Sequence, residues 1–334
     1  MITRPPRILR VSSEVLRSNP LGDPFERDLI VYLPPDHDPA RPTPALLALA
    51  GFTGNGAMLF NADPLGDSLG ARLDRLIASG ACPPVVVAAP DCFTRFGGNQ
   101  YIDAPCTGRY EAYLVEEILP RVEREVAVSR WGVFGKSSGG YGAIVLAMRN
   151  PDRFQAFADH SGDANFELAY LPDALEALDQ IRGRGSIRAW LDAYWAGDQR
   201  RRPAQVKALG FIAMAAHYSG SDDPARLASD DMGIDLPFDL ETGAFREDVW
   251  ARWRAWDPVR MIGAHADALA KQRVRFVDSG TRDEYGLHWG ARAVVKAIRA
   301  LGLDVVHEEF DDGHMNIPYR FERSIPLLAK ALEA

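Results

Sequence analysis

The chain has little positive charge and no long apolar run, and each shortage excludes a class of protein. Its 38 lysines and arginines stand against 46 acidic residues, a formal net charge of -8, so no basic stripe or arm is available for a nucleic-acid backbone. No segment approaches the roughly 18 uncharged apolar residues that span a bilayer, and the first residues lack the apolar core of a signal peptide. We expect a cytoplasmic protein with no nucleic-acid and no membrane partner.

Cysteine is also scarce. The three cysteines, Cys82, Cys92 and Cys106, do not have the paired spacing of a metal site. We therefore expect reduced thiols and no bound metal. Cys92 and Cys106 flank one loop, and a bridge between them stays open at this point.

What the chain does have is apolar material for a large core. Of its 334 residues, 47% are hydrophobic and 25% charged, as in folded globular domains. Short apolar runs alternate with helical patterns, which indicates an α/β fold with a mostly parallel central sheet flanked by helices on both faces. The expected strands are 7–17, 25–33, 44–51, 83–91, 130–135, 154–162, 272–280 and 303–310. The expected helices are 65–79, 109–126, 138–149, 286–301 and 320–333.

An insertion interrupts this alternation. About 110 residues separate the sixth and seventh expected strands, where a single helix needs only about 10 to 15. The segment 164–255 is rich in aromatic and helix-forming residues. We interpret it as a mainly helical cap over the carboxyl edge of the sheet, inserted into a core domain formed by 1–163 and 256–334. Alternatively, it extends the core or forms a contact in a homo-oligomer.

The segment GKSSGG, residues 135–140, follows the apolar run RWGVF and precedes a helix-prone stretch. It fits Gly-x-Ser-x-Gly, in which the serine occupies a strained turn from strand to helix and the glycines let neighbouring backbone approach. The pattern predicts Ser137 as a nucleophile, which needs a base to take its proton and an acid to orient that base. A phosphate-binding loop is the alternative. It is disfavoured because neither Gly-x-Gly-x-x-Gly nor the P-loop order is present.

The base is expected near the end of the chain if the order is serine, acid, histidine. Of the seven histidines, His314 stands in the turn FDDGHMNIP directly after the last expected strand. A loop there can bring an imidazole over the edge of the sheet. His307 lies within that strand and is expected to be structural, while His288 and His217 are expected to be surface or helix-capping residues.

The acid is expected in the turn VDSGTRDEYG, after the preceding strand. Asp283 lies four residues past Ser279, in a glycine-containing turn that can aim a carboxylate at the histidine. We predict Asp283 as the acid. Asp278 at the end of the strand, its neighbour Glu284, and Asp163 after the sixth strand are the alternatives.

A developing oxyanion needs two fixed hydrogen-bond donors. The backbone N–H of Ser138 supplies one, as the residue after the nucleophile. The second is expected from the loop LALAGFTGNG after the third strand, where Phe52 is the best-placed amide. Gly51 and the glycines at 54 and 56 let the backbone of this loop approach a ligand.

Taken together, the segments AGFTGNG, GKSSGGYGA, GTRDEYG and DDGHMN and the helix YEAYLVEEILPRVE resemble the esterase D branch of the α/β-hydrolases. This branch also contains enterochelin-esterase-like and feruloyl-esterase-like domains and the mycolyltransferases. The resemblance covers most of the chain outside the insertion. It implies that Ser137, Asp283 and His314 form the triad, and that Phe52 and Ser138 form the oxyanion hole.

The resemblance also implies a substrate loop at 91–110, with Asn99, Gln100 and Tyr101 lining the cleft together with Gly51. A solvated connection is the equal alternative for this loop.

Two features depart from the family. Lys136 and Ser138 occupy variable positions of the elbow, which contribute mainly backbone, and the insertion is long for the short S-formylglutathione hydrolases, which leaves the substrate open.

These expectations converge on a serine carboxylic-ester hydrolase that acts on a small-molecule ester through an acyl-enzyme. No cofactor is implied, because hydrolysis needs none of the electronics that cofactors supply. The alternatives are an acyltransferase that uses the same acyl-enzyme, a thioesterase, and a binding protein without catalysis. The binding protein is disfavoured because all three triad positions are filled.

Overall fold

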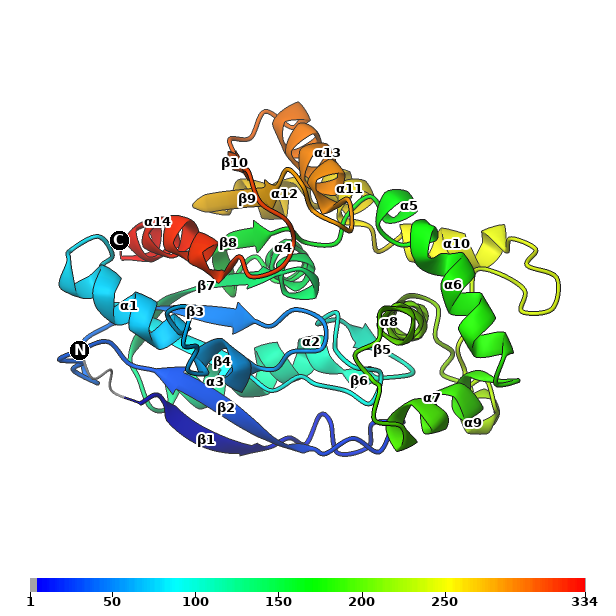
Figure 1. Cartoon of the computed structure of the whole chain (residues 1–334). Coiled ribbons are helices and arrows are strands. Elements are labelled where there is room, and N and C mark those ends of the chain that lie inside the picture. The colour runs from blue at the N-terminus through cyan, green and yellow to red at the C-terminus, as the bar shows by residue number, and fades with distance from the viewer. Residues whose placement is uncertain (1–4, 334) are drawn as a thin grey trace.

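In the computed structural model, which describes residues 5–333, eight strands form one mostly parallel sheet (Figure 1). The strand order is β1-β2-β4-β3-β7-β8-β9-β10, with β2 antiparallel to both neighbours and the other pairs parallel. The sheet strands are β1 (Arg7–Ser12), β2 (Glu26–Tyr32), β3 (Thr43–Leu49), β4 (Val86–Pro90), β7 (Val128–Lys136), β8 (Phe154–His160), β9 (Val274–Gly280) and β10 (Val306–Phe310). The expected α/β fold with a mostly parallel sheet is confirmed.

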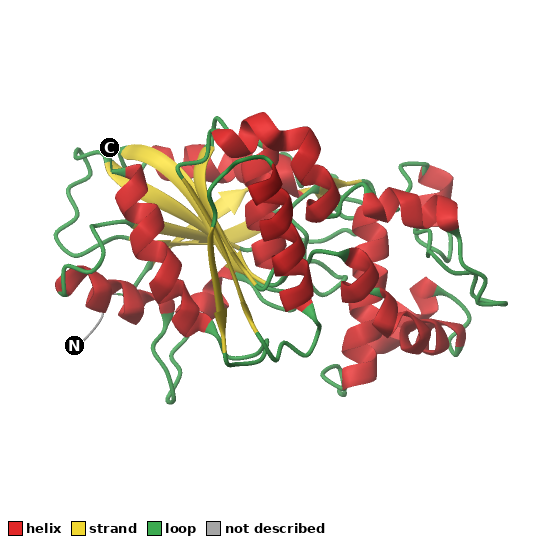
Figure 2. Ribbon diagram, turned by 90° about the horizontal axis from the view of Figure 1, so that it is seen from above, coloured by secondary structure: helices red, strands yellow, loops and turns green. Residues whose placement is uncertain are grey.

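Helices cover both faces of this sheet (Figure 2). One face carries α1 (Leu69–Ala78) and α14 (Phe321–Leu332), and the other carries α2 (Tyr110–Ala112), α3 (Leu119–Glu123), α4 (Ser138–Arg149) and α13 (Leu287–Ala300). Helix α1 begins where the Ser68 hydroxyl accepts the N–H of Ala71, and its buried side chains, Leu69, Leu73 and Leu76, recur at helical spacing. The five helices expected around the sheet are present, with ends that differ by a few residues.

The segment between β8 and β9 is helical. It contains α5 (Phe166–Ala169), α6 (Leu171–Arg182), α7 (Ile187–Ala196), α8 (Pro203–Tyr218), α9 (Pro224–Ala228), α10 (Glu247–Arg254), α11 (Pro258–Met261) and α12 (Ala266–Ala270). Figure 1 shows α6 to α10 beside one end of the sheet, separate from the helices that cover its faces. Helix α8 is buried nearly all round along its second half, which explains why its sequence is apolar on every side.

Several local features differ from the expectations. The first strand ends at Ser12 rather than at 17, because Ser13 begins a turn in which its hydroxyl accepts the N–H of Leu16. A small hairpin, β5 (Asp103–Ala104) and β6 (Gly108–Arg109), was not expected, and a π-helical stretch spans Tyr113–Ile118. Short 3₁₀ helices occupy Gly56–Phe60, Ile262–His265 and Pro318–Arg320.

The three cysteines are buried and free, so Cys92 and Cys106 do not form a bridge. Cys106 Sγ instead contacts the carbonyl of Met232 at 3.5 Å. Within residues 5–333 there is no group of three metal-binding side chains. None of the helices described is long and apolar enough to cross a membrane.

Candidate active site

The turn from β7 into α4 holds Ser137 in a backbone conformation that L-residues rarely adopt, with φ 60° and ψ -127°. Glycines on both sides permit this turn. A Cβ on Gly139 would lie 2.2 Å from the carbonyl oxygen of Leu49, and one on Gly135 would lie 2.5 Å from the carbonyl carbon of Gly139. The strain is maintained because the neighbouring strands hold the turn from both sides, and such strain is typical of functional sites.

Backbone hydrogen bonds fix the turn on the sheet. The N–H of Ser137 donates to the carbonyl of His160, the last residue of β8, at 2.9 Å, and the N–H of Tyr141 donates to the carbonyl of Ser137. Ser137 is partly exposed, whereas Ser138 and the helix behind it are buried. The turn therefore presents the Ser137 side chain at the carboxyl end of the central strands.

Asp283 and His314 lie on turns that follow β9 and β10, and their side chains meet. His314 Nδ1 lies 2.7 Å from Asp283 Oδ2, and both residues are buried. The N–H groups of Tyr285 and Leu287 donate to the other carboxylate oxygen. Burial alone would raise the pKa of Asp283, but the hydrogen bond and charge of His314 and these backbone donors outweigh it and hold the pKa below its ordinary value.

Contacts between the two turns hold the imidazole in place. The backbone N–H of His314 donates to Glu284 Oε2 at 2.6 Å, and the ring of Tyr285 packs edge-on against the imidazole at 4.9 Å. A Cβ on Gly280 would lie 2.4 Å from the carbonyl of Asp312, so the two loops touch through backbone. With Nδ1 bonded to the carboxylate, Nε2 is the ring nitrogen that can take a proton.

The three other acids considered for the triad have other partners. Asp278 bonds to His160, and Glu284 accepts the backbone N–H of His314. Asp163 accepts hydrogen bonds from Gln100, Ser138 and Tyr170. Among the described residues, Asp283 is the one carboxylate hydrogen-bonded to the imidazole of His314.

Asp163 also links the two halves of the site. Its Oδ2 accepts the hydroxyl of Ser138, the residue after the elbow serine, at 3.4 Å. Burial raises the pKa of Asp163, and the nearby charge of His314 acts in the opposite direction. Asp163 therefore lies near both the elbow and the loop that carries His314. No hydrogen bond joins Ser137 to His314 within residues 5–333, so their pairing stays a prediction.

Two backbone N–H groups near the elbow, those of Phe52 and Ser138, were expected to form the oxyanion hole. Neither Phe52 nor Ser138 donates its N–H to a protein acceptor within the described part of the chain. The loop carrying Phe52 lies against the elbow, since a Cβ on Gly51 would meet the carbonyl of Lys136 at 3.1 Å and Ser137 Cβ at 3.4 Å. This close approach is the reason for a glycine at position 51.

Of the four residues expected to line the substrate cleft, Asn99, Gln100 and Tyr101 are buried and Gly51 is partly exposed. Gln100 Nε2 lies 2.9 Å from Ser138 Oγ and 2.9 Å from Met214 Sδ of α8, while its Oε1 is buried without a partner among the described residues. Asn99 accepts the N–H of Tyr101, and its own Nδ2 has no partner in residues 5–333. The hydroxyl of Tyr101 donates to the carbonyl of Ala50 and so supports the loop that carries Phe52. The role of these four residues in a substrate cleft stays a prediction.

His217 also differs from the expectation of a surface residue. It is 3% exposed and its Nδ1 contacts the carbonyl of Ala213 in α8. Its Nε2 accepts the N–H of Gln100, and burial lowers its pKa to about 4, so the ring is neutral. His217 therefore joins the helical insertion to the loop beside the elbow.

A second group of polar side chains, which we call the buried histidine network, lies behind the elbow. It comprises His160, Asp278, Ser324 and Arg320. His160 Nδ1 lies 2.7 Å from Asp278 Oδ1 and its Nε2 lies 2.8 Å from Ser324 Oγ, while Arg320 Nε donates to Asp278 Oδ2 at 2.9 Å. The network ties β8 and β9 to α14, and sequence reasoning missed it.

Lys136, the residue before the elbow serine, carries a cation at the edge of the site. It forms no ion pair with any described carboxylate. Burial lowers its pKa to about 8, although Asp283, Asp163 and Glu284 act in the opposite direction. Burial of the charged ammonium group therefore destabilises the folded protein, and the three carboxylates offset this effect only in part.

Replacing Lys136 with methionine is expected to stabilise the protein at pH 7 by about 1 to 3 kcal/mol, because the cost of the desolvated charge is removed. The folded pKa of about 8 lies below the ordinary value near 10.4, so the unfolded chain holds this proton more tightly. The destabilisation by the Lys136 charge is therefore largest below pH 8 and decreases as the pH rises toward about 10.4. Urea unfolding at pH 7 and at pH 10.5 measures the gain. An equal gain at both pH values would contradict this account.

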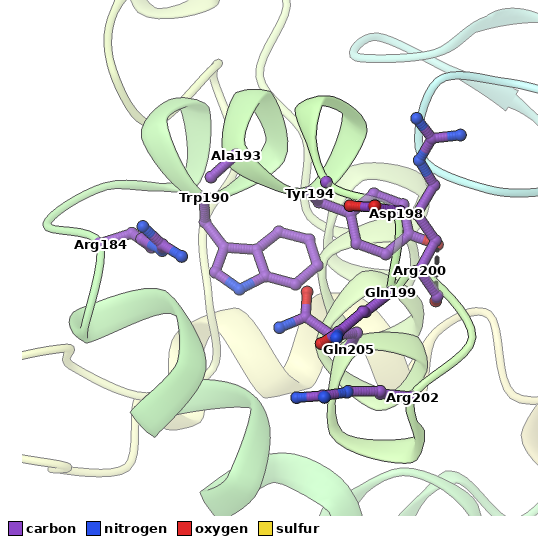
Figure 3. A pocket seen from close by; sticks show the side chains of 10 residues that line it. Arg184, Trp190, Ala193, Tyr194, Asp198, Gln199, Arg200, Arg202 and Gln205 are labelled. Atoms are coloured by element: carbon purple, nitrogen blue, oxygen red, sulfur yellow. Dashed lines mark hydrogen bonds between the residues drawn. The ribbon is translucent and has the colours of Figure 1, made fainter.

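Two hollows lie outside these loops. A cavity of about 200 Å³ in the helical segment has Trp190, stacked on Tyr194, in its wall (Figure 3). It is lined by Arg184, Trp190, Ala193, Tyr194, Gly197, Asp198, Gln199, Arg200, Arg202 and Gln205. A larger hollow of about 420 Å³ reaches the Phe52 loop at Asn55. Neither is lined by Ser137 or His314.

The mostly parallel sheet and the helices on its two faces are those of the α/β-hydrolase fold. The chain belongs to the esterase family described as "Putative esterase", whose profile matches residues 23–299.

Other similarities are more distant. An uncharacterised protein of Corynebacterium glutamicum is 23% identical over 245 residues, which is 67% of this chain and 54% of that protein. The chain thus spans about half the length of this curated relative.

Solved structures share the fold at low sequence identity. A ferulic acid esterase superposes with a TM-score of 0.60 at 18% identity, covering 98% of this chain and 99% of the other. An S-formylglutathione hydrolase from Agrobacterium tumefaciens gives 0.55 at 18% identity, with 97% and 94% covered. A fluorophosphonate-binding serine hydrolase of Staphylococcus aureus gives 0.57 at 15% identity, with 98% and 99% covered.

Proposed function

We propose that the protein hydrolyses carboxylic esters of small molecules through Ser137, His314 and Asp283. The observation that carries the proposal is the 2.7 Å contact between His314 and Asp283 on the loops after β10 and β9, at the edge of the sheet that presents the strained Ser137. Ferulic acid esterase and S-formylglutathione hydrolase, which share the fold, bear names that describe ester and thioester cleavage.

In the first half of the reaction, Ser137 Oγ attacks the ester carbonyl carbon while His314 Nε2 takes the hydroxyl proton. Asp283 keeps Nδ1 protonated and stabilises the imidazolium. The negative charge on the carbonyl oxygen is held by the N–H groups of Phe52 and Ser138. When the carbon–oxygen bond breaks, His314 returns the proton to the leaving alcohol.

In the second half, water replaces the alcohol. His314 takes a proton from the water as the water oxygen attacks the acyl carbon. When the tetrahedral intermediate collapses, His314 returns this proton to Ser137 Oγ and the carboxylic acid leaves. Atoms balance with one water consumed for each ester cleaved. The chemistry uses the side chains and backbone of this chain alone.

The helical segment 164–255 acts as a cap over this site. Three contacts support this role: Tyr170 donates to Asp163, Met214 of α8 contacts Gln100, and Gly210 of α8 lies against the ring of Phe52. Because the segment touches Asp163 and the loops beside the elbow, its position determines which esters enter and how much water reaches the acyl-enzyme.

A fluorophosphonate probe is expected to label the protein once, on Ser137, and to abolish ester hydrolysis in proportion to labelling. His314→Ala is expected to slow labelling by about 100-fold or more, because the base that activates the serine is missing. Peptide mapping by mass spectrometry locates the label. Labelling of Ser138 or of no residue would reject the assignment, and heat-unfolded protein serves as the unlabelled control.

Adding an alcohol during turnover of p-nitrophenyl acetate distinguishes hydrolysis from acyl transfer. For a hydrolase we expect acetate as the main product even when acceptor alcohol is present, because water resolves the acyl-enzyme. A predominant transesterified product would instead assign the same acyl-enzyme to acyl transfer. Chromatography of the products measures this partition.

A further inference from the structure

Asp163 is a carboxylate held in place beside the proposed site, although it belongs to no triad. It follows β8 and is 7% exposed, so an edge of it stays accessible. Its Oδ2 accepts three hydrogen bonds: from Tyr170 at 3.0 Å, from Gln100 at 3.2 Å and from Ser138 at 3.4 Å. These donors come from the helical insertion, the 91–103 loop and the elbow, which orient the carboxylate from three directions.

The described residues place no cation in ion-pair contact with this carboxylate. All three donors are uncharged, and Asp163 forms no ion pair with a lysine or arginine within residues 5–333. Its Oδ1 has no hydrogen-bond partner in the same range. The charge of Asp163 raises the pKa of Lys136, but the two side chains form no ion pair. Asp283 and Glu284 act on Lys136 in the same direction, so they are further negative charges in this region. A cation or a hydrogen-bond donor at Oδ1 would stabilise a buried carboxylate of this kind further.

Asp163 also lies close to where an acyl group would sit. In the proposed reaction the carbonyl oxygen faces the N–H of Ser138, and the hydroxyl of the same residue contacts Asp163. A negative charge at this position opposes the developing oxyanion. A positively charged or hydrogen-bond-donating group on the acyl part of the substrate would offset that effect and satisfy the free Oδ1.

We propose that Asp163 is a specificity-determining residue that binds a hydrogen-bond donor, an ammonium group in preference to a hydroxyl, on the acyl part of the ester. This inference rests on the proposed function and adds the substrate class to it. Gln100 and Tyr170 position the carboxylate. Esters whose acyl part carries a carboxylate are excluded by charge repulsion from Asp163, Asp283 and Glu284.

The test uses methyl benzoates that differ in one meta or para substituent: aminomethyl, hydroxymethyl, ethyl or carboxymethyl. Each ester is measured as a competitor of p-nitrophenyl acetate hydrolysis, which gives an affinity whether or not the ester is turned over. In at least one positional series, the aminomethyl ester is expected to bind about tenfold or more tightly than the ethyl ester. The hydroxymethyl ester is expected to fall between them and the carboxymethyl ester to bind most weakly.

Asp163→Asn removes the charge and keeps an oxygen that can accept from Tyr170 and Gln100. The affinity ratio between the aminomethyl and ethyl esters is expected to fall by about tenfold in this variant. Asp152→Asn, which removes an exposed carboxylate of the same size that pairs with Lys271, is the matched control and is expected to keep the wild-type ratio. The affinities for both esters are measured on the same protein sample. A variant with a smaller active fraction therefore gives the same affinity ratio.

The outcomes separate this inference from the proposed function. If p-nitrophenyl acetate is not hydrolysed at all, the proposed function fails. If it is hydrolysed but the wild-type protein does not distinguish the aminomethyl from the ethyl ester in either series, the role of Asp163 is wrong and the esterase assignment stands. Retention of the full preference in Asp163→Asn would overturn the inference in the same way, and the wild-type ranking tests it even if the variant does not fold.

Discussion

Replacing Ser137 with alanine is expected to lower kcat for p-nitrophenyl acetate by about a thousandfold or more, because the acyl-enzyme cannot form. The fold is expected to persist, since no protein group within residues 5–333 accepts a hydrogen bond from the Ser137 hydroxyl. Thermal unfolding measured beside the hydrolysis rate checks both statements. Retained turnover in a folded variant would remove Ser137 from the mechanism.

Two further variants sharpen this test. Ser138→Ala keeps the backbone N–H and is expected to lose no more than about tenfold in kcat, which separates the two adjacent serines. Ser137→Gly is expected to be as inactive as the alanine variant yet more stable by about 1 kcal/mol, because glycine adopts the observed φ of 60° without strain. If glycine destabilised the protein relative to alanine, the strained elbow would be an incorrect description.

The largest effect on stability is expected at Asp278. Replacing it with alanine leaves His160 and Arg320 without their shared partner in a region where Asp278 and His160 are fully buried. Breaking a buried ion pair by removing one partner costs about 3 to 5 kcal/mol. Urea unfolding gives the change in the free energy of unfolding, and ester hydrolysis under folding conditions shows whether the elbow stays in place.

The matched control is Asp152→Ala, which breaks an ion pair with Lys271 on the surface, where the Asp152 side chain is 86% exposed. Exposed pairs of this kind contribute about 0 to 1 kcal/mol. A loss at Asp278 as small as the loss at Asp152 would show that the buried histidine network contributes little to the fold.

The sequence predicted the elements whose patterns are local. The strands β3, β4 and β7 are continuous apolar runs because both of their faces are covered, and each was expected within a few residues of its observed bounds. The glycines around Ser137 are also a local pattern, and they predicted the turn that carries this serine. The meeting of Asp283 with His314 was expected from chain order, since turns that follow adjacent parallel strands lie at one edge of the sheet.

Contacts between distant residues could not be predicted in the same way. His160 meets Asp278 and Ser324, which are 118 and 164 positions away, and no local pattern connects them. His217 was expected to be a surface or helix-capping residue because it belongs to the insertion, yet α8 buries it against Gln100. The resemblance implied a cleft role for Tyr101, but no local pattern connects its hydroxyl with the carbonyl of Ala50, 51 positions away.

In the buried histidine network, hydrogen bonds connect the hydroxyl of Ser324 to the imidazole of His160, and this imidazole to the carboxylate of Asp278. The same order of groups is proposed for Ser137, His314 and Asp283, where Ser137 is partly exposed. Ser324 is wholly enclosed, so no acyl carbon can approach its oxygen. In the proposed mechanism, access of an ester to the hydroxyl distinguishes Ser137 from Ser324. A reagent that modified Ser324 would therefore report unfolding instead of catalysis.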